Sequence, residues 1–168
     1  MKLKVAGIVD DSVVDGDGVR LTVFTQGCPH RCPGCQNPET HDFNAGGYFT
    51  DTDDILRQVD ANPLLSGVTF SGGEPFMQPA PLAKLAQDLH KHHKDVWSYS
   101  GFTLDELLAS KNPAVHELLD EVDVLVDGRY DESQRDLTLT FRGSRNQRII
   151  DMNAYRQTGK LKLLYANE

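Results

Sequence analysis

The sequence predicts an α/β fold in which a mainly parallel sheet forms a short, open, partial (β/α) barrel. Apolar, β-branched runs alternate with amphipathic segments, and the joints between them are short, which is the pattern of parallel β/α units. The chain has 168 residues, which is too few for eight full β/α units. We therefore expect a single domain over residues 1–168, with the barrel left open on one side.

The first half of the chain alternates predicted strands and helices. Runs rich in β-branched and apolar residues predict the strands. One helix begins with acidic residues, which suit the positive end of the helix dipole, and the other places its leucines on one face. The expected strands are 3–9, 19–27 and 67–73, the helices are 51–61 and 79–93, and 36–50 is a loop.

The second half continues the alternation. Thr103 and Glu106 have the spacing of a capping box, and Asn112 precedes a proline at a first helical position. The expected helices are 103–110 and 112–122, the strands are 95–101 and 122–128, and 137–141 and 160–165 are weaker strand candidates. Ligands bind at the carboxyl ends of strands in such sheets. The cysteine run and the motifs SGGEP, WSYSG and VDGRY follow strand ends, so we expect one functional rim.

All three cysteines lie in one short stretch, as Cys28, Cys32 and Cys35. Soft thiolates select zinc or iron–sulfur centres. A structural zinc site takes four ligands, so His41 would have to complete a Cys3His set. A [4Fe–4S] cluster usually takes four cysteines, and three would leave one iron with an open position. The spacing alone leaves both metal centres possible.

The cysteine spacing after a strand, followed by SGGEP at residues 71–75, resembles the radical S-adenosylmethionine enzymes. Further stretches resemble one branch, the activating proteins of anaerobic ribonucleoside-triphosphate reductase; they are GDGVRLTVFTQGCPHRCPGCQNPET, VWSYSGFTLDEL, VDVLVDGRY and FRGSRNQRII. The resemblance implies a fold of the radical S-adenosylmethionine type. It also implies a [4Fe–4S] cluster on the three cysteines, with S-adenosyl-L-methionine chelating the open iron.

In that family, an electron from the cluster cleaves the cofactor, and the resulting radical abstracts hydrogen from a glycine of the partner. The implied partners are the reductase, as protein substrate, and an electron donor such as flavodoxin. Two alternatives within the family are an activating enzyme of the pyruvate formate-lyase type and 7-carboxy-7-deazaguanine synthase. A zinc-stabilised protein-binding module is an alternative from a different class.

The resemblance also implies which residues hold the cofactor. The SGGEP turn would lie against the methionine ammonium, with Glu74 as an orienting residue. Gly34 stands where many relatives carry an aromatic residue, which implies backbone contacts to adenine. The strand-end serines would hold the ribose hydroxyls or the carboxylate, and Asp127 would lie near that carboxylate. The implied cofactor-binding residues are Gly34, Cys35, Gln36, Gly72, Gly73, Glu74, Pro75, Ser98, Ser100 and Asp127.

A basic patch stands out in an otherwise acidic chain. It comprises Arg142, Arg145, Asn146, Gln147 and Arg148. Such a patch is either an exposed, solvated loop or a contact for the partner or for the cofactor's carboxylate, which arginine grips bidentately. Arg20 is a further candidate for that carboxylate.

Composition excludes several classes of protein. The chain has 17 Lys and Arg against 25 Asp and Glu, a net charge of −8, which argues against nucleic acid as the main partner. No apolar run approaches the roughly 18 residues of a membrane span, and no secretory signal is recognisable. An odd cysteine count without such a signal is typical of the reducing cytoplasm.

Overall fold

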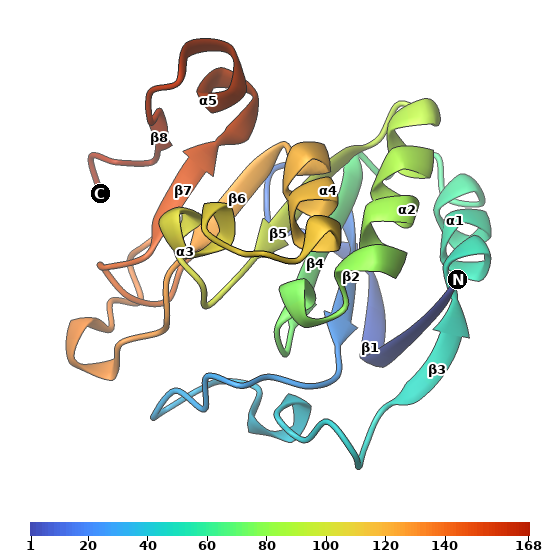
Figure 1. Cartoon of the computed structure of the whole chain (residues 1–168), viewed down its shortest axis with the longest axis horizontal. Coiled ribbons are helices and arrows are strands. Elements are labelled where there is room, and N and C mark those ends of the chain that lie inside the picture. Colours follow the sequence, from blue (N-terminus) through green and yellow to red (C-terminus); the bar gives the residue numbers. More distant parts are fainter.

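The computed structural model describes all residues, 1–168, and contains one eight-stranded sheet (Figure 1). The strand order is β3-β1-β2-β4-β5-β6-β7-β8, and the edge strands β3 and β8 do not pair with each other, so the sheet is open. The strands are β1 (Lys2–Ser12), β2 (Arg20–Thr25), β3 (Tyr48–Asp51), β4 (Gly67–Gly72), β5 (Asp95–Tyr99), β6 (Val124–Asp127), β7 (Arg148–Asp151) and β8 (Leu163–Leu164).

The centre of the sheet is parallel. Strands β2, β4, β5 and β6 pair in parallel with their neighbours, and antiparallel pairs flank them at β1, β3, β7 and β8. Only β1 and β7 run against the common direction, so the predicted mixed α/β fold with a mainly parallel sheet is confirmed. In this arrangement the carboxyl ends of four central strands meet at one rim.

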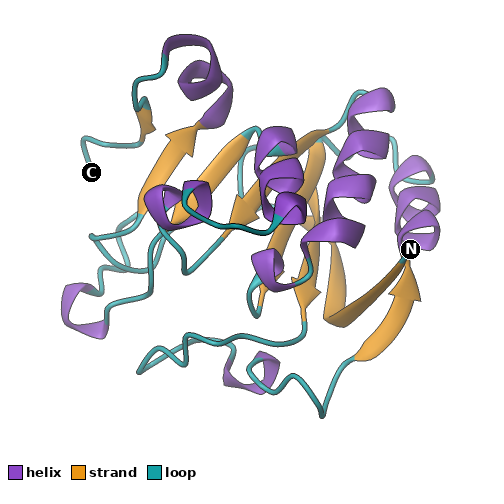
Figure 2. Cartoon of the chain, viewed as in Figure 1, coloured by secondary structure: helices purple, strands orange, loops and turns teal.

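Helices cover one face of the sheet (Figures 1 and 2). Leucines and valines from this helical layer and from alternate strand positions form one buried core cluster, because successive strand side chains point to opposite faces. The helices are α1 (Thr52–Asp60), α2 (Pro79–Lys91), α3 (Leu104–Leu108), α4 (Pro113–Glu121) and α5 (Met152–Thr158), with 3₁₀ turns η1 (Pro38–Thr40), η2 (Pro75–Met77) and η3 (Glu132–Gln134).

Side chains cap the helices as the sequence predicts. The Thr103 side chain accepts from the Glu106 backbone N–H, and the Glu106 carboxylate reaches back to the Thr103 N–H, so the capping box of α3 is complete. The Asn112 side chain accepts from the Ala114 N–H at the start of α4. No helix combines the length and apolar character needed to cross a bilayer.

Several predicted elements are wrong or incomplete. Residues 137–141 form turns rather than a strand, because Thr138 bonds to the Asp136 carboxylate and Phe141 has a φ of 61°, which is incompatible with extended backbone. The candidate at 160–165 is reduced to the two residues of β8. The predicted loop 36–50 contains η1 and the start of β3. Strand β7 and helix α5 were not predicted; both are short and follow one another directly.

Candidate functional site

A cavity of about 470 Å³ lies at the rim where the four parallel strands end. Its wall is formed by the cysteine loop after β2, the glycine turn after β4 and the segments after β5 and β6. The lining residues are Val14, Asp15, Phe24, Cys28, His30, Cys32, Cys35, Gln36, Asn37, His41, Ser71, Gly72, Gly73, Tyr99, Ser100, Gly101, Gly128, Tyr130, Phe141, Gly143 and Gln147.

The cysteine loop is closed at its base by backbone hydrogen bonds. The N–H of Gly27 donates to Thr40 O at 2.6 Å, and the N–H of Cys28 donates to His41 O at 3.1 Å. The amide of Gln26 adds bonds to three carbonyls at the far end of the loop. Residues 28–40 therefore form a compact loop whose ends are fixed on the carboxyl end of β2.

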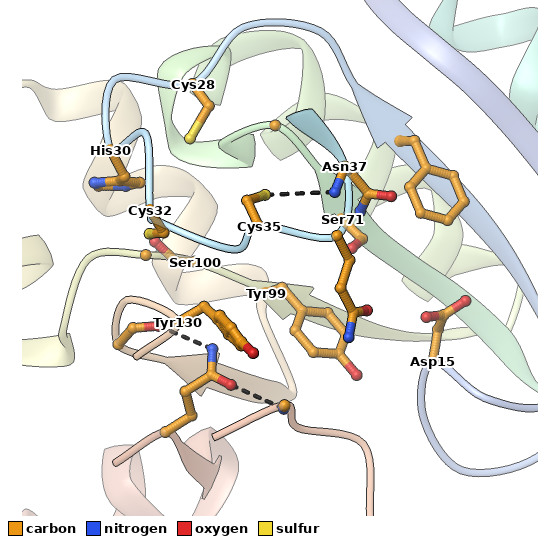
Figure 3. A pocket seen from close by; sticks show the side chains of 18 of the residues that line it. Asp15, Cys28, His30, Cys32, Cys35, Asn37, Ser71, Tyr99, Ser100 and Tyr130 are labelled. Atoms are coloured by element: carbon orange, nitrogen blue, oxygen red, sulfur yellow. Dashed lines mark hydrogen bonds between the residues drawn. The ribbon is translucent and has the colours of Figure 1, made fainter. Parts of the chain in front are cut away.

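The three thiols face the cavity from this one loop (Figure 3). All three are free. Burial raises the pKa of the Cys28 and Cys32 thiols, so metal binding would displace a proton from each. The Asn37 N–H donates to Cys35 Sγ at 3.4 Å. Three thiols on a common wall form a donor set that fits an iron–sulfur cluster.

His41, the fourth ligand that a Cys3His zinc site would need, lines the same cavity. This wall therefore offers two donor sets, the three thiols alone or the three thiols with His41.

The glycine turn after β4 is joined to the base of the cysteine loop. The N–H of Gly73 donates to Thr25 O, and the N–H of Glu74 donates to Gly27 O, both at 2.8 Å. A Cβ at Gly72, whose φ is 96°, would lie 2.5 Å from the Thr25 nitrogen, and one at Gly73 would lie 2.4 Å from Gly27 O. Only glycine allows this close backbone approach.

Glu74 lies behind the cavity wall rather than on it. Its side chain is fully buried, and its carboxylate accepts hydrogen bonds from Ser100 Oγ, the Gly101 N–H and the Phe76 N–H, in addition to a contact with His30. Pro75 is buried at the start of η2. Glu74 therefore holds together the segments behind the cavity wall, and its predicted role toward the cofactor stays a prediction.

Strand alternation separates the residues predicted on β5 and β6. The cavity lies on the face of Tyr99, whereas Ser98 and Asp127 point to the helical face and do not line it. The Asp127 carboxylate already accepts three hydrogen bonds. They come from Arg148 Nε at 3.0 Å, Arg148 Nη2 at 2.5 Å and the Leu104 N–H at 2.8 Å. Direct contact of Ser98 or Asp127 with the cofactor is therefore not supported by this placement.

Some of the other predicted residues line the cavity, and the rest lie away from it. Ser100 and Gln36 line the cavity, although the Ser100 hydroxyl is engaged with Glu74. Gly34 is exposed on the cysteine loop and lies against Glu132, so that it does not line the cavity. Arg20 is fully buried at the opposite end of β2, bonded to Thr69 and paired with Asp95. The expectation that Arg20 grips a cofactor carboxylate is wrong because the guanidinium is sealed inside the fold.

The basic patch of residues 142–148 is largely turned inward. The amide of Gln147 accepts from the N–H groups of Gly143 and Ser144 and donates to Gly128 O, which ties two cavity segments together. Other side chains of the patch bond to backbone carbonyls or to Asp127. Arg145 is different, because its side chain is 58% exposed and pairs only with Asp136.

Several residues of the cavity wall were not predicted from the sequence. Asp15 lies across the cavity from the cysteine loop (Figure 3), and it accepts from Ser12 Oγ and Thr22 Oγ1. The alternation of β2, β4 and β5 was the available signal, since it places the wall residues of these strands on one face. The overlooked residues include Val14, Asp15, Phe24, Asn37, Tyr130 and Phe141.

Several known proteins are similar to this chain in sequence. Residues 14–150 match the family described as "4Fe-4S single cluster domain". The chain is 39% identical over 142 residues to the anaerobic ribonucleoside-triphosphate reductase-activating protein of Escherichia coli (strain K12). The aligned region covers 80% of this chain and 90% of the relative. The protein of the same name from Enterobacteria phage T4 is 30% identical over 141 residues. That alignment covers 81% of this chain and 86% of the phage protein.

One solved structure has a similar fold. QueE from Escherichia coli superimposes with a TM-score of 0.54 over 61% of this chain and 54% of that one, at 17% sequence identity. At this identity the likeness concerns the fold alone. It agrees with an α/β chain built on one mainly parallel sheet.

Proposed function

The chain belongs to the family of anaerobic ribonucleoside-triphosphate reductase-activating proteins, and we propose that it generates a glycyl radical on that reductase. It would do so by reductive cleavage of S-adenosyl-L-methionine at a [4Fe–4S] cluster. One observation supports this most strongly: three free thiols and a side-chain-free glycine turn face the same cavity.

The chain's residues have separate tasks in this proposal. Cys28, Cys32 and Cys35 would hold the cluster, and the backbone of Gly72 and Gly73 would meet the methionine end of the cofactor. When bound, the cluster supplies the electron that cleaves the cofactor to methionine and a radical able to take hydrogen from a glycine. The protein's own contribution is to bind, orient and exclude water.

The aromatic wall is suited to excluding water. Tyr99, Tyr130 and Phe141 line the cavity beyond the cysteines. The Tyr99 hydroxyl donates to Phe141 O at 2.5 Å, and burial raises the pKa of Tyr99, so the phenol remains protonated. A neutral, fixed wall of this kind would shield a reactive species without offering it an ionised group.

Finer features belong to the same proposal. The open sheet would act as one wall of a partial barrel, leaving a side through which a glycine-bearing loop can enter. Residues 1–168 would form one domain. An electron donor such as flavodoxin would reduce the cluster. The cytoplasm is the proposed location, because free cysteines persist in a reducing compartment.

The experiment is anaerobic reconstitution with iron and sulfide, followed by reductant and S-adenosyl-L-methionine. We expect a brown protein that releases methionine and 5′-deoxyadenosine in equal amounts. Cys35→Ala should abolish both the colour and the products. A colourless protein that binds one zinc ion and cleaves no cofactor would contradict the proposal.

A further inference from the structure

His30 joins the cysteine loop to the buried carboxylate of Glu74. Its side chain is 5% exposed, and its Nε2 lies 2.7 Å from Glu74 Oε1. Its ring packs edge-on against Phe102, with ring centroids 4.5 Å apart. A Cβ at Gly101 would lie 2.3 Å from the ring. The imidazole is therefore held between the cysteine loop and the segment that follows β5.

Glu74 has no free capacity for another ligand. His30 Nε2 and Glu74 Oε1 share one hydrogen bond of 2.7 Å. Ser100 Oγ contacts both carboxylate oxygens at 3.0 Å, the Gly101 N–H donates at 2.7 Å and the Phe76 N–H at 3.0 Å. All of these donors come from the chain itself. Glu74 thus orders its surroundings rather than the contents of the cavity.

His30 belongs to the loop that carries the thiols, between Cys28 and Cys32. Its ring contacts the carboxylate of Glu74, the residue that follows the Gly72–Gly73 turn. One side chain therefore joins the cysteine loop to the glycine turn.

We propose that His30 is a positioning residue that couples the cysteine loop to the Gly72–Gly73 turn, an inference that rests on the function proposed above. Its hydrogen bond to Glu74 fixes the cysteine loop relative to the turn that meets the cofactor. Without the donor, the three cysteines still bind iron. The loop then moves relative to the turn, so cofactor affinity falls and the bound cofactor perturbs the cluster less.

The test compares His30→Gln with His30→Met. Glutamine places an amide N–H near the position of Nε2, whereas methionine fills a similar volume without a donor. Full-length protein is reconstituted anaerobically and three quantities are measured: iron per chain, the Kd for S-adenosyl-L-methionine, and the electron paramagnetic resonance spectrum of the reduced cluster with and without cofactor. The Gln variant should stay within about twofold of the unmodified protein, and the Met variant should lose about tenfold or more in affinity at unchanged iron content.

A matched control is His92→Ala. His92 Nδ1 lies 2.7 Å from Asp60 Oδ1 on the exposed surface, so this variant loses a similar contact away from the cavity and should change none of the three quantities. Equal affinities and spectra for the Gln and Met variants would overturn the inference. So would a Met variant that loses its iron, because the role would then be structural. If the unmodified protein binds neither iron nor cofactor, the proposed function fails instead.

Discussion

The carbonyl oxygen of Gly27 lies where a side chain on Gly73 would have to go, since a Cβ at Gly73 would come within 2.4 Å of it. Gly27 immediately precedes the first cysteine, and the adjacent Glu74 N–H donates to the same carbonyl at 2.8 Å. The Gly72–Gly73 turn and the cysteine loop are therefore in direct backbone contact. A change on one of them is transmitted to the other.

Gly73→Ala should consequently damage both sites. The added methyl group must push Gly27 away, because a backbone carbonyl cannot rotate aside as a flexible side chain can, and overpacking of this kind costs about 1–3 kcal/mol. We expect lower iron content after anaerobic reconstitution and an S-adenosyl-L-methionine affinity reduced by about tenfold or more. Gly7→Ala is the control, since a Cβ there meets no atom within 4 Å. Normal iron and cofactor binding by Gly73→Ala would place the cofactor elsewhere.

The cysteines and His41 should behave differently although all of them line the cavity. Cys28→Ala, Cys32→Ala and Cys35→Ala should each lose most of the iron and all cofactor cleavage, because a cluster with two thiolates is poorly held. His41→Ala should keep its iron. Metal analysis and visible absorption on the four variants decide the matter. A folded His41→Ala protein that has lost its metal would support a Cys3His zinc site.

His90 predicts a pH-dependent contribution to stability. It lies between Glu121 and Asp123, with each ring nitrogen 2.8 Å from a carboxylate oxygen. Burial lowers the pKa of His90, but the hydrogen bonds to the two carboxylates outweigh this, and the pKa is raised overall. The stabilisation is therefore fully present below the unfolded-state pKa of about 6.5 and is lost as the pH rises through the folded-state pKa.

The test compares the free energy of unfolding of the unmodified protein and His90→Gln across pH. The difference should be about 1 kcal/mol near pH 6, as for a partly exposed ion pair, and should shrink toward pH 9. The pKa of Asp123 is lowered, because its hydrogen bonds, led by that from His90, outweigh the effect of burial. The stability that the ionised Asp123 carboxylate contributes is accordingly lost only as the pH falls through its lowered folded-state pKa. A difference that does not change with pH would show that folding leaves the pKa of His90 unshifted and would contradict this prediction.

Arg145 is the candidate for contact with the reductase. It is the arginine of the 142–148 patch that remains largely exposed, and arginine is enriched at protein interfaces. Arg145→Glu should lower glycyl-radical formation on the reductase about tenfold, because it reverses a docking charge. The rate of 5′-deoxyadenosine release without the reductase should not change.

A matched control for this variant is Arg57→Glu on α1. Arg57 is also exposed and pairs with an exposed aspartate, Asp54, but it lies in the helical layer away from the cavity. The Arg57→Glu variant should leave unchanged both glycyl-radical formation on the reductase and 5′-deoxyadenosine release without it. If Arg145→Glu lowers both rates together, the patch serves the cofactor site and the docking assignment is wrong.

The order of elements and the functional rim could be predicted from the sequence. Local signals determine both, since β-branched runs identify strands and the Thr103 and Asn112 caps identify helix starts. The parallel arrangement then places the segments after β2, β4, β5 and β6 at one edge. The cysteine spacing and the SGGEP motif needed no long-range information to be recognised.

The face of each strand could not be predicted in the same way. Alternation shows that Ser98 and Tyr99 point in opposite directions, but not which face the helices cover; the packing of α2 and α4 decides that. A sequence also does not reveal whether a polar side chain is already bonded within the chain. Asp127 is occupied by Arg148, which reaches it because β7 returns antiparallel to β6.

The most direct test of the account is transfer of the radical to the reductase. The chain is incubated anaerobically with a reductant, S-adenosyl-L-methionine and the anaerobic ribonucleoside-triphosphate reductase, and the electron paramagnetic resonance spectrum is recorded. The account predicts a glycyl-radical doublet on the reductase, formed together with 5′-deoxyadenosine and absent with Cys28→Ala. Cofactor cleavage that proceeds normally while no glycyl radical appears on the reductase would contradict it.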